Sequence, residues 1–343
     1  MGGHVMFTGK QSWAFPSYPS ILSSGVVTGP FEAQSPLNNT FDYIFDDRRM
    51  GETTFEKAQV VLMEEACQQA VQKAGKTMQD VAFIYGGDLI NQDTGTSFAM
   101  RTLNVPYYGL FGACSTSMEA LSLAAQAVEM GAPLVLAGTA SHYAAIEKQF
   151  RYPIEYGAQR PPTAQRTVTA GGAALLAPNG STNIVVTKST IGKVVDHGLK
   201  DPYNLGGAMA PAAVDTILAH FDDFQVDEND YDLIITGDLG NVGRALALEW
   251  FRQEEHPMPE AKFQDCGLLI YDNAPEAMAG ASGTGCSAAV IFGKILDDIT
   301  KGRLKRVLAV ATGALLSPVT SQQKESIPGI AHAVTLEAKG GAV

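Results

Sequence analysis

The sequence predicts an α/β fold in which two duplicated halves stack as five layers, α-β-α-β-α. Three observations lead to this fold class. Short apolar strands alternate with helical segments, a pattern that indicates parallel strands joined by crossover helices. Motifs in the first half of the chain recur in the same order in the second half. Only 17% of the 343 residues are charged and 35 are glycine, so we expect a large interior behind a small surface.

Each half begins with a helical stretch that leads into a short apolar strand ending in Gly-Asp-Leu. The helices are predicted over residues 56–73 and 212–221, and the strands over residues 80–89 and 232–239. Asp88 and Asp238 therefore end strands at the sheet edge where ligands of α/β proteins bind. Their carboxylates would repel an anion unless calcium or a hydrogen-bond network intervenes. We interpret both as caps of the segments that follow.

Each half continues with a cysteine, a helix of small residues and a further strand. Cys114 opens the first of these units and Cys286 the second. The helices are predicted over residues 115–130 and 287–299, and the strands over residues 134–140 and 306–312. The helix after Cys114 is apolar on nearly every face, which indicates a helix buried on all sides. The chain thus divides into halves of residues 1–183 and 184–343.

Charge and hydropathy exclude several classes of partner. Lys and Arg total 24 against 36 Asp and Glu, a net charge of −12, which repels nucleic acid and anionic membrane surfaces. Residues 1–30 do not read as a signal peptide, and the most hydrophobic stretch, residues 307–316, is far shorter than the roughly 20 residues that span a bilayer. We expect a soluble, cytoplasmic protein. The spacing of the four cysteines signals neither a metal site nor a disulfide framework, and no cofactor is expected.

Several motifs carry a resemblance to known proteins. They are 111–119 (Phe-Gly-Ala-Cys-Ser-Thr-Ser-Met-Glu), 149–153 (Gln-Phe-Arg-Tyr-Pro), 169–176 (Thr-Ala-Gly-Gly-Ala-Ala-Leu-Leu), 208–213 (Ala-Met-Ala-Pro-Ala-Ala), 311–318 (Ala-Thr-Gly-Ala-Leu-Leu-Ser-Pro) and 323–328 (Gln-Lys-Glu-Ser-Ile-Pro). The duplication, the Cys-Ser pair and the glycine-rich strand resemble the thiolase and ketoacyl-synthase superfamily. More narrowly, the motifs resemble the stage V sporulation protein AD family over nearly all of residues 7–337. This resemblance implies a thiolase-like fold and binding of dipicolinic acid, pyridine-2,6-dicarboxylate, in spore-forming bacteria.

Cys114 is the candidate nucleophile, because the N-terminus of a helix favours a thiolate. In the enzymes that the chain resembles, two further groups activate the second substrate and stabilise the enolate, usually two histidines or a histidine with an asparagine or cysteine. The matching segments here, residues 237–241 and 282–286, contain no histidine, and the loop at 327–332 has no cysteine. Condensing activity is therefore not expected. Cys114 is interpreted either as a buried residue at a helix start or as a pocket-lining, acylable thiol.

Three histidines are candidate ligand-binding residues. His142 closes the strand after the Cys114 helix, His332 lies in the C-terminal loop, and His197 precedes a glycine. The alternative for each is a histidine that stabilises its own loop. Three others, in polar or terminal contexts, are expected to be solvated: His4, His220 and His256.

The segment 148–166 reverses the charge balance of the chain. It holds four basic residues against the single acid Glu155, together with aromatic residues and three prolines. Arginine forks pair with carboxylates and aromatic rings offer a stacking surface, so this composition suits a flat aromatic dicarboxylate. The ligand-binding candidates are Arg151, Tyr152 and Tyr156, accompanied by Lys148, Phe150, Arg160 and Arg166. The competing interpretation is a loop that contacts a second subunit.

The leading hypothesis is a noncatalytic thiolase-like protein that binds dipicolinic acid, free or as its calcium chelate, for uptake or release in spore formation and germination. The alternative is an acyltransferase or condensing enzyme that uses Cys114 as its nucleophile. A third hypothesis is a scaffold that contacts other sporulation proteins. We expect a homodimer. Partner proteins of the spore membrane would recruit it peripherally to the spore inner membrane.

Overall fold

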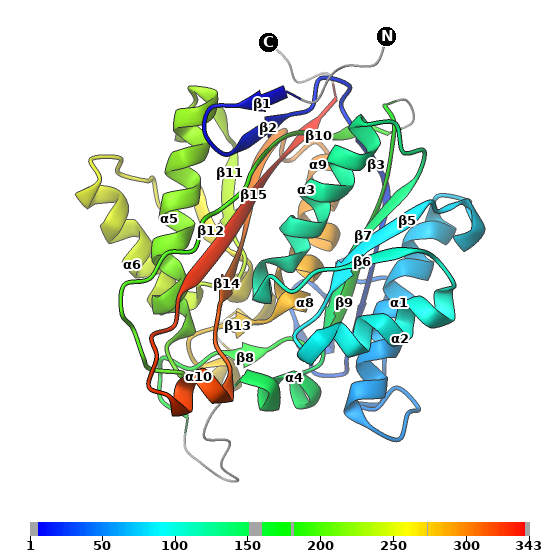
Figure 1. Cartoon of the computed structure of the whole chain (residues 1–343), viewed down its shortest axis with the longest axis horizontal. Coiled ribbons are helices and arrows are strands. Elements are labelled where there is room, and N and C mark those ends of the chain that lie inside the picture. Colours follow the sequence, from blue (N-terminus) through cyan, green and yellow to red (C-terminus); the bar gives the residue numbers. More distant parts are fainter. Residues whose placement is uncertain (1–5, 151–159, 180–181, 273, 340–343) are drawn as a thin grey trace.

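The computed structural model of the chain describes residues 6–150, 160–179, 182–272 and 274–339 (Figure 1). Within these ranges, two runs of five strands make up most of one 13-stranded sheet. The first run has the order β3 (Ser20–Thr28), β9 (Ala170–Ala177), β7 (Val135–Ser141), β5 (Phe83–Gly87) and β6 (Tyr107–Gly109). The second has the order β10 (Ile184–Thr190), β15 (Gly329–Ala338), β14 (Arg306–Ala314), β11 (Leu233–Thr236) and β12 (Phe263–Asp265). The predicted boundary between residues 183 and 184 falls directly before β10.

Both runs mix parallel and antiparallel pairing. β5 pairs in parallel with β6 and β7, and β11 pairs in parallel with β12 and β14. β9 and β15 run antiparallel to their neighbours. The predicted parallel pairing therefore holds for the strands of the two repeats and does not extend to β9 and β15. The reason is that α4 (Tyr143–Phe150) and α10 (Pro318–Gln322), which precede them, lie at the strand ends and do not carry the chain back along the sheet (Figure 1).

Helices enclose the two runs in layers (Figure 1). α1 (Phe55–Lys73) packs on the outer side of the first run with α2 (Thr94–Leu103) against it, and α5 (Leu205–Phe224) packs on the second run with α6 (Gly240–Gln253). α3 (Thr116–Glu129) lies in the middle and contacts β5 and β7 as well as β14 and β15. This is the predicted α/β fold of layers α-β-α-β-α. In the described part of the chain, no helix combines the length and apolar character needed to cross a bilayer.

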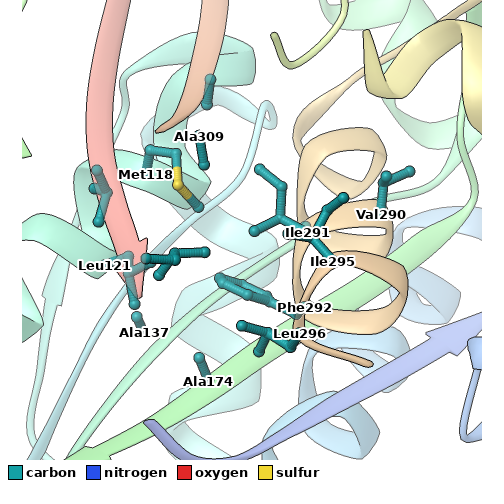
Figure 2. Close-up of a cluster of buried hydrophobic side chains, with 14 of the residues drawn as sticks. Met118, Leu121, Ala137, Ala174, Val290, Ile291, Phe292, Ile295, Leu296 and Ala309 are labelled. Carbon is teal, nitrogen blue, oxygen red and sulfur yellow. The ribbon is translucent and has the colours of Figure 1, made fainter. Parts of the chain in front are cut away.

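The main hydrophobic core lies where α3 meets the helical segment after Cys286 (Figure 2). Met118 and Leu121 of α3 face Ile291 and Phe292, and all four side chains are at most 1% exposed. Each such burial stabilises the fold by roughly 1.5–3 kcal/mol. An interior shared between the two runs of strands therefore accounts for the low share of charged residues.

Helix boundaries follow their capping residues. α1 begins after Thr54, whose hydroxyl oxygen accepts a hydrogen bond from the Lys57 N–H at 3.3 Å. α5 begins at Leu205, earlier than predicted, because the Asn204 side chain caps it by accepting from the Gly207 N–H at 3.1 Å. The helix predicted over 287–299 instead has three parts. They are α8 (Thr284–Ala289), a π-helical turn (Val290–Ile295) and α9 (Leu296–Thr300).

Candidate functional site

A cavity of about 270 Å³ lies beside Cys114 and is lined by residues of both halves. Most lining side chains are apolar, and Asn91, Gln149, Ser317 and Thr320 supply polar groups. The described lining residues are Leu89, Asn91, Phe111, Ala113, Cys114, Gln149, Phe150, Leu205, Ala314, Leu315, Leu316, Ser317 and Thr320. Sites for drug-sized ligands typically measure ~300–1,000 Å³. The cavity therefore suits a compact ligand.

A sharp turn places Cys114 on the cavity wall. Ala113 has a φ of +53°, in the left-handed region that residues with a Cβ seldom adopt. A Cβ at Gly112 would lie 2.2 Å from Glu119 Oε2, and one at Gly313 would lie 2.8 Å from the Gly112 carbonyl oxygen. Glycine is therefore required at Gly313, because β14 approaches the backbone of the turn closely, whereas a side chain at Gly112 would displace the Glu119 carboxylate.

Polar groups of the second half surround the Cys114 thiol. Its Sγ is 3.9 Å from Ser282 Oγ, and this hydroxyl donates to Asp238 Oδ2 at 2.9 Å. Asp238 also accepts from the Gly283 N–H at 3.0 Å and from Thr312 Oγ1 at 2.7 Å, and it is 1% exposed. Asp238 and Ser282 belong to the segments 237–241 and 282–286, where the resemblance led us to look for further catalytic groups. Here those segments supply a carboxylate and a hydroxyl in place of imidazole.

Burial governs the protonation of this site. It raises the pKa of Asp238 to about 6, although the Thr312 and Gly283 hydrogen bonds oppose the shift. The carboxyl is therefore mostly ionised at neutral pH. Burial also raises the pKa of the Cys114 thiol well above its usual range, and the nearby Asp238 charge raises it further. Burial and the Asp238 charge therefore both disfavour the thiolate that was expected from its place at a helix start.

His142 is buried beside α1 and does not line the Cys114 cavity. Its ring stacks on Phe55 at 5.1 Å between centroids, and its Nε2 lies 2.8 Å from the Arg48 carbonyl oxygen. Its Nδ1 accepts from the Ala144 N–H at 3.2 Å. Burial lowers its pKa, so the ring is neutral and holds α1 against the end of β7.

The other predicted histidines also lie away from the lining of this cavity. The prediction that His332 lies in a loop was wrong, because the residue is buried on β15. Its Nδ1 accepts from the Gly192 N–H at 3.2 Å, and burial lowers its pKa to about 4. His197 is exposed and packs against Trp250 with ring centroids 4.9 Å apart, in a different cleft. His256 is exposed as predicted, and His4 lies outside the described residues. The prediction that His220 is solvated was wrong, because its ring is fully buried.

The basic run is partly neutralised by its surroundings. Lys148 pairs with Glu56, and Arg160 pairs with Glu147 at 2.5 Å. The Arg166 guanidinium lies between the Phe31 and Tyr143 rings, at 3.9 and 4.3 Å from their centroids. Arg151, Tyr152 and Tyr156 lie outside the described residues. Phe150, which precedes Arg151 in the chain, lines the Cys114 cavity.

Sequence reasoning missed the pairing of Asp238 and Ser282 with Cys114. Asp88 does cap the following segment, because it accepts from the Ile90 and Thr96 N–H groups at 2.6 Å. Asp238 does not cap its own segment, and Asp265 binds the Leu239 and Gly240 N–H groups instead. The repeated Gly-Asp-Leu motif was the sequence signal for Asp238. Its partner Ser282 lies 44 residues later in the chain, so only the fold shows that the two residues meet.

Comparisons with known proteins agree with this architecture. The family model of stage V sporulation protein AD matches residues 9–337. Stage V sporulation protein AD of Bacillus subtilis (strain 168) is 45% identical over 339 residues, covering 98% of this chain and 100% of that protein.

Solved enzymes share the fold at low identity. 3-Oxoacyl-[acyl-carrier-protein] synthase III of Aquifex aeolicus VF5 is 14% identical with a TM-score of 0.56, over 93% of this chain and 99% of the enzyme. Human mitochondrial 3-ketoacyl-CoA thiolase is 10% identical with a TM-score of 0.58, over 95% of this chain and 99% of the enzyme. With its thiolase-like fold and its match along almost the whole length, the chain belongs to the stage V sporulation protein AD family.

Proposed function

We propose that the chain binds dipicolinate, free or as its calcium chelate, in the Cys114 cavity and carries out no chemistry on it. The observation that carries this proposal is the buried Asp238 carboxylate, which lies near the Cys114 thiol with Ser282 Oγ between them. Nucleophilic catalysis needs a thiolate and a base or neutral donor near it. A buried carboxylate beside the thiol disfavours the thiolate by charge repulsion, and when ionised it donates no hydrogen bond to a developing enolate. What remains is a small, structured cavity in a sporulation protein family.

The cavity lining suits a flat ring that carries polar groups. Phe111 and Phe150 offer aromatic surfaces, and the side chains of Asn91 and Gln149 can donate hydrogen bonds to carboxylates. None of the described lining residues is positively charged. A dianion needs a cation, and Arg151, the next residue after Phe150, is our candidate for it.

Calorimetric titration of the full chain with dipicolinate tests the proposal directly. Picolinate, which has one carboxylate, and isophthalate, which lacks the ring nitrogen, are the comparison ligands, each measured with and without calcium. Leu316→Trp should fill the cavity and abolish binding, whereas Leu246→Trp, at an exposed position of α6, should leave binding unchanged. Absence of heat and of thermal stabilisation at millimolar dipicolinate would refute the proposal.

Arg151→Ala should weaken dipicolinate binding by roughly 1.5–3 kcal/mol, about 10- to 150-fold, if its guanidinium pairs with a carboxylate. The same titration measures this loss. Lys148→Ala is the matched control from the same basic run, because Lys148 already pairs with Glu56. The dipicolinate affinity of this control variant should stay within about twofold of that of the unmodified chain, since exposed ion pairs contribute little to stability. Equal affinity of the Arg151 variant and the unmodified chain would place the cation elsewhere.

An acyltransferase that uses Cys114 is the second candidate, favoured by the position of the thiol on the cavity wall. Intact-mass measurement after incubation with acetyl-CoA tests it, with Cys114→Ala as the control. An acyl adduct that disappears in the variant supports the enzyme. A chain without an adduct has no covalent step. A scaffold for other spore membrane proteins is the remaining hypothesis, and it predicts specific partners even when both small-molecule tests fail.

A further inference from the structure

A second cleft, of about 560 Å³, lies on the face of the molecule formed by α5 and α6. The turn between β1 (Met6–Thr8) and β2 (Ser12–Ala14) closes one side, and the segment after β10 closes another. Figure 1 shows the β1–β2 hairpin lying at the C-terminal end of α5. The described lining of this cleft shares no residue with that of the Cys114 cavity, so the two are separate sites.

The hairpin is fixed on α5 by a set of hydrogen bonds. Asp223 accepts from the N–H groups of Lys10 and Gln11, at 2.8 and 3.1 Å, and from Ser12 Oγ at 2.7 Å. A Cβ at Gly9 would lie 2.0 Å from Asp223 Oδ1, so only glycine fits there, with a φ of +61°. The cleft is therefore preformed, which lowers the entropic cost of binding.

The buried groups beneath the hairpin continue this network. Ser12 Oγ lies 2.8 Å from Thr190 Oγ1, which is 2.8 Å from His220 Nδ1. His220 Nε2 is 2.7 Å from the Tyr231 hydroxyl. All four residues are at most 1% exposed, so the network ties β2, β10 and α5 together and supports the wall of the cleft.

The floor of the cleft is apolar and its rim is acidic. Val214, Leu218 and Trp250 line the floor, while four carboxylates and two lysines line the rim. Asp223 is engaged by the hairpin, and Asp215 Oδ1 pairs with Lys193 at 2.8 Å. Asp215 Oδ2 is buried without a hydrogen-bond partner. Among the described residues, no hydrogen bond or ion pair engages the carboxylates of Asp222 and Glu254.

We propose that this cleft docks a partner protein through a segment in which arginine alternates with apolar residues. Apolar side chains would cover Val214 and Leu218, and an arginine would lie against the Trp250 indole and pair with Asp222 or Glu254. A guanidinium matches this lining better than an ammonium, because it stacks on aromatic faces and also binds carboxylates bidentately. This inference is independent of dipicolinate binding.

Tryptophan fluorescence tests the proposal, because the chain has two tryptophans and Trp13→Phe leaves Trp250 as the only reporter. The probe is the synthetic peptide acetyl-Leu-Arg-Leu-Arg-Leu-amide, titrated into the full chain at 0.15 M salt. A saturable change in Trp250 emission is expected. The acidic counterpart acetyl-Leu-Glu-Leu-Glu-Leu-amide should cause none. No saturable change up to ~1 mM basic peptide, where binding would be weaker than about −4 kcal/mol, overturns the proposal.

Two double variants separate docking from general attraction to an acidic chain. Asp222→Asn with Glu254→Gln should weaken peptide binding by about tenfold, since each removes a charge from the rim. Asp46→Asn with Glu325→Gln removes the same amount of negative charge at exposed positions outside the cleft. This control variant should weaken peptide binding by less than about twofold. An equal loss of peptide affinity in the two double variants would overturn the proposal. So would binding of acetyl-arginine-amide as tight as that of the peptide, because the apolar floor would then contribute nothing.

Discussion

Two electrostatic influences oppose each other at the Cys114 thiol. A helix N-terminus stabilises an adjacent anion by roughly 0.3–1 kcal/mol, which is less than one pKa unit. Burial of an ionisable group shifts its pKa by up to 3–5 units, and a neighbouring carboxylate adds to the shift for a thiol. Cys114 is 8% exposed and lies near Asp238, so the second influence prevails and the thiol stays protonated. Position in sequence alone would have suggested a reactive thiolate.

Removing the charge of Asp238 should make Cys114 more reactive. Asp238→Asn keeps the size of the side chain and an oxygen that can accept from Thr312. The pKa of the thiol should fall, and the rate of iodoacetamide alkylation at Cys114 should rise by about tenfold for each pKa unit lost, because the thiolate is the nucleophile. Peptide mass spectrometry over time measures this rate. Asp265→Asn is the matched control, since Asp265 binds the N–H groups of Leu239 and Gly240. An unchanged rate at Cys114 in the Asp238 variant would show that its charge does not control the thiol.

At the scale of elements, sequence patterns located the central helices and strands of the two repeats but misplaced several of their boundaries. The helix predicted over 56–73 matches α1 (Phe55–Lys73), because its cap and its apolar positions are local features. α5 starts at Leu205, since glycines and Pro211 concealed a first turn that Asn204 caps. The direction of β9 and β15 depends on where α4 and α10 lie, which local periodicity does not encode. His220 was misjudged for a similar reason, because its partners Thr190 and Tyr231 come from other elements.

The edge strand β6 is the element where we expect a second copy of the chain to bind. In the described part of the chain β6 pairs only with β5, and its three residues are exposed. Tyr108 is 65% exposed and Phe111 is 56% exposed, which is unusual for large aromatic side chains at a sheet edge. Antiparallel pairing of β6 with its own copy is self-complementary about a two-fold axis.

Tyr108→Glu should therefore convert a dimer into a monomer, because it brings like charges together across that axis. Light scattering after size exclusion measures the mass, with the unmodified chain expected at twice 36.3 kDa. Leu246→Glu, at an exposed position of α6, is the control and should remain dimeric. A monomeric unmodified chain, or a dimeric Tyr108 variant, would contradict the assignment of β6 as the interface.

At the scale of the whole molecule, the two halves share buried polar groups as well as apolar ones. Ser117 of α3 and Ser287 of α8 place their hydroxyl oxygens 2.7 Å apart. Glu32, in the first half, accepts from the Thr169 N–H at 2.9 Å and from the Tyr271 hydroxyl of the second half at 2.7 Å. The low charge of the sequence predicted a large shared interior, but it carried no sign that a carboxyl would be buried there. The partners of Glu32 are 137 and 239 residues away in the chain, beyond any local pattern.

Burial of Glu32 makes the stability of the whole fold depend on pH. Burial raises its pKa from 4.5 to about 7, although hydrogen bonds from Thr169 and Tyr271 oppose the shift, and its Oε2 has no hydrogen-bond partner. In the unfolded chain the carboxyl loses its proton near pH 4.5, whereas in the folded chain it keeps the proton until about pH 7. The unfolded state therefore binds fewer protons between these values, and the free energy of unfolding falls as pH rises, by up to ~3 kcal/mol from this group.

Glu32→Gln should remove this contribution, because glutamine resembles the protonated carboxyl and does not titrate. The amide would leave a buried donor unpaired and lower stability by about 1–3 kcal/mol at every pH, so the informative quantity is the difference between pH 5 and pH 8. Urea unfolding at both values measures it. The decrease in unfolding free energy from pH 5 to pH 8 should be smaller in the variant by ~1–3 kcal/mol. Glu325→Gln, at an exposed position, should leave the decrease unchanged. If the Glu32 variant and the unmodified chain lose equal stability over this range, Glu32 ionises without cost, and the contact between the halves tolerates its charge.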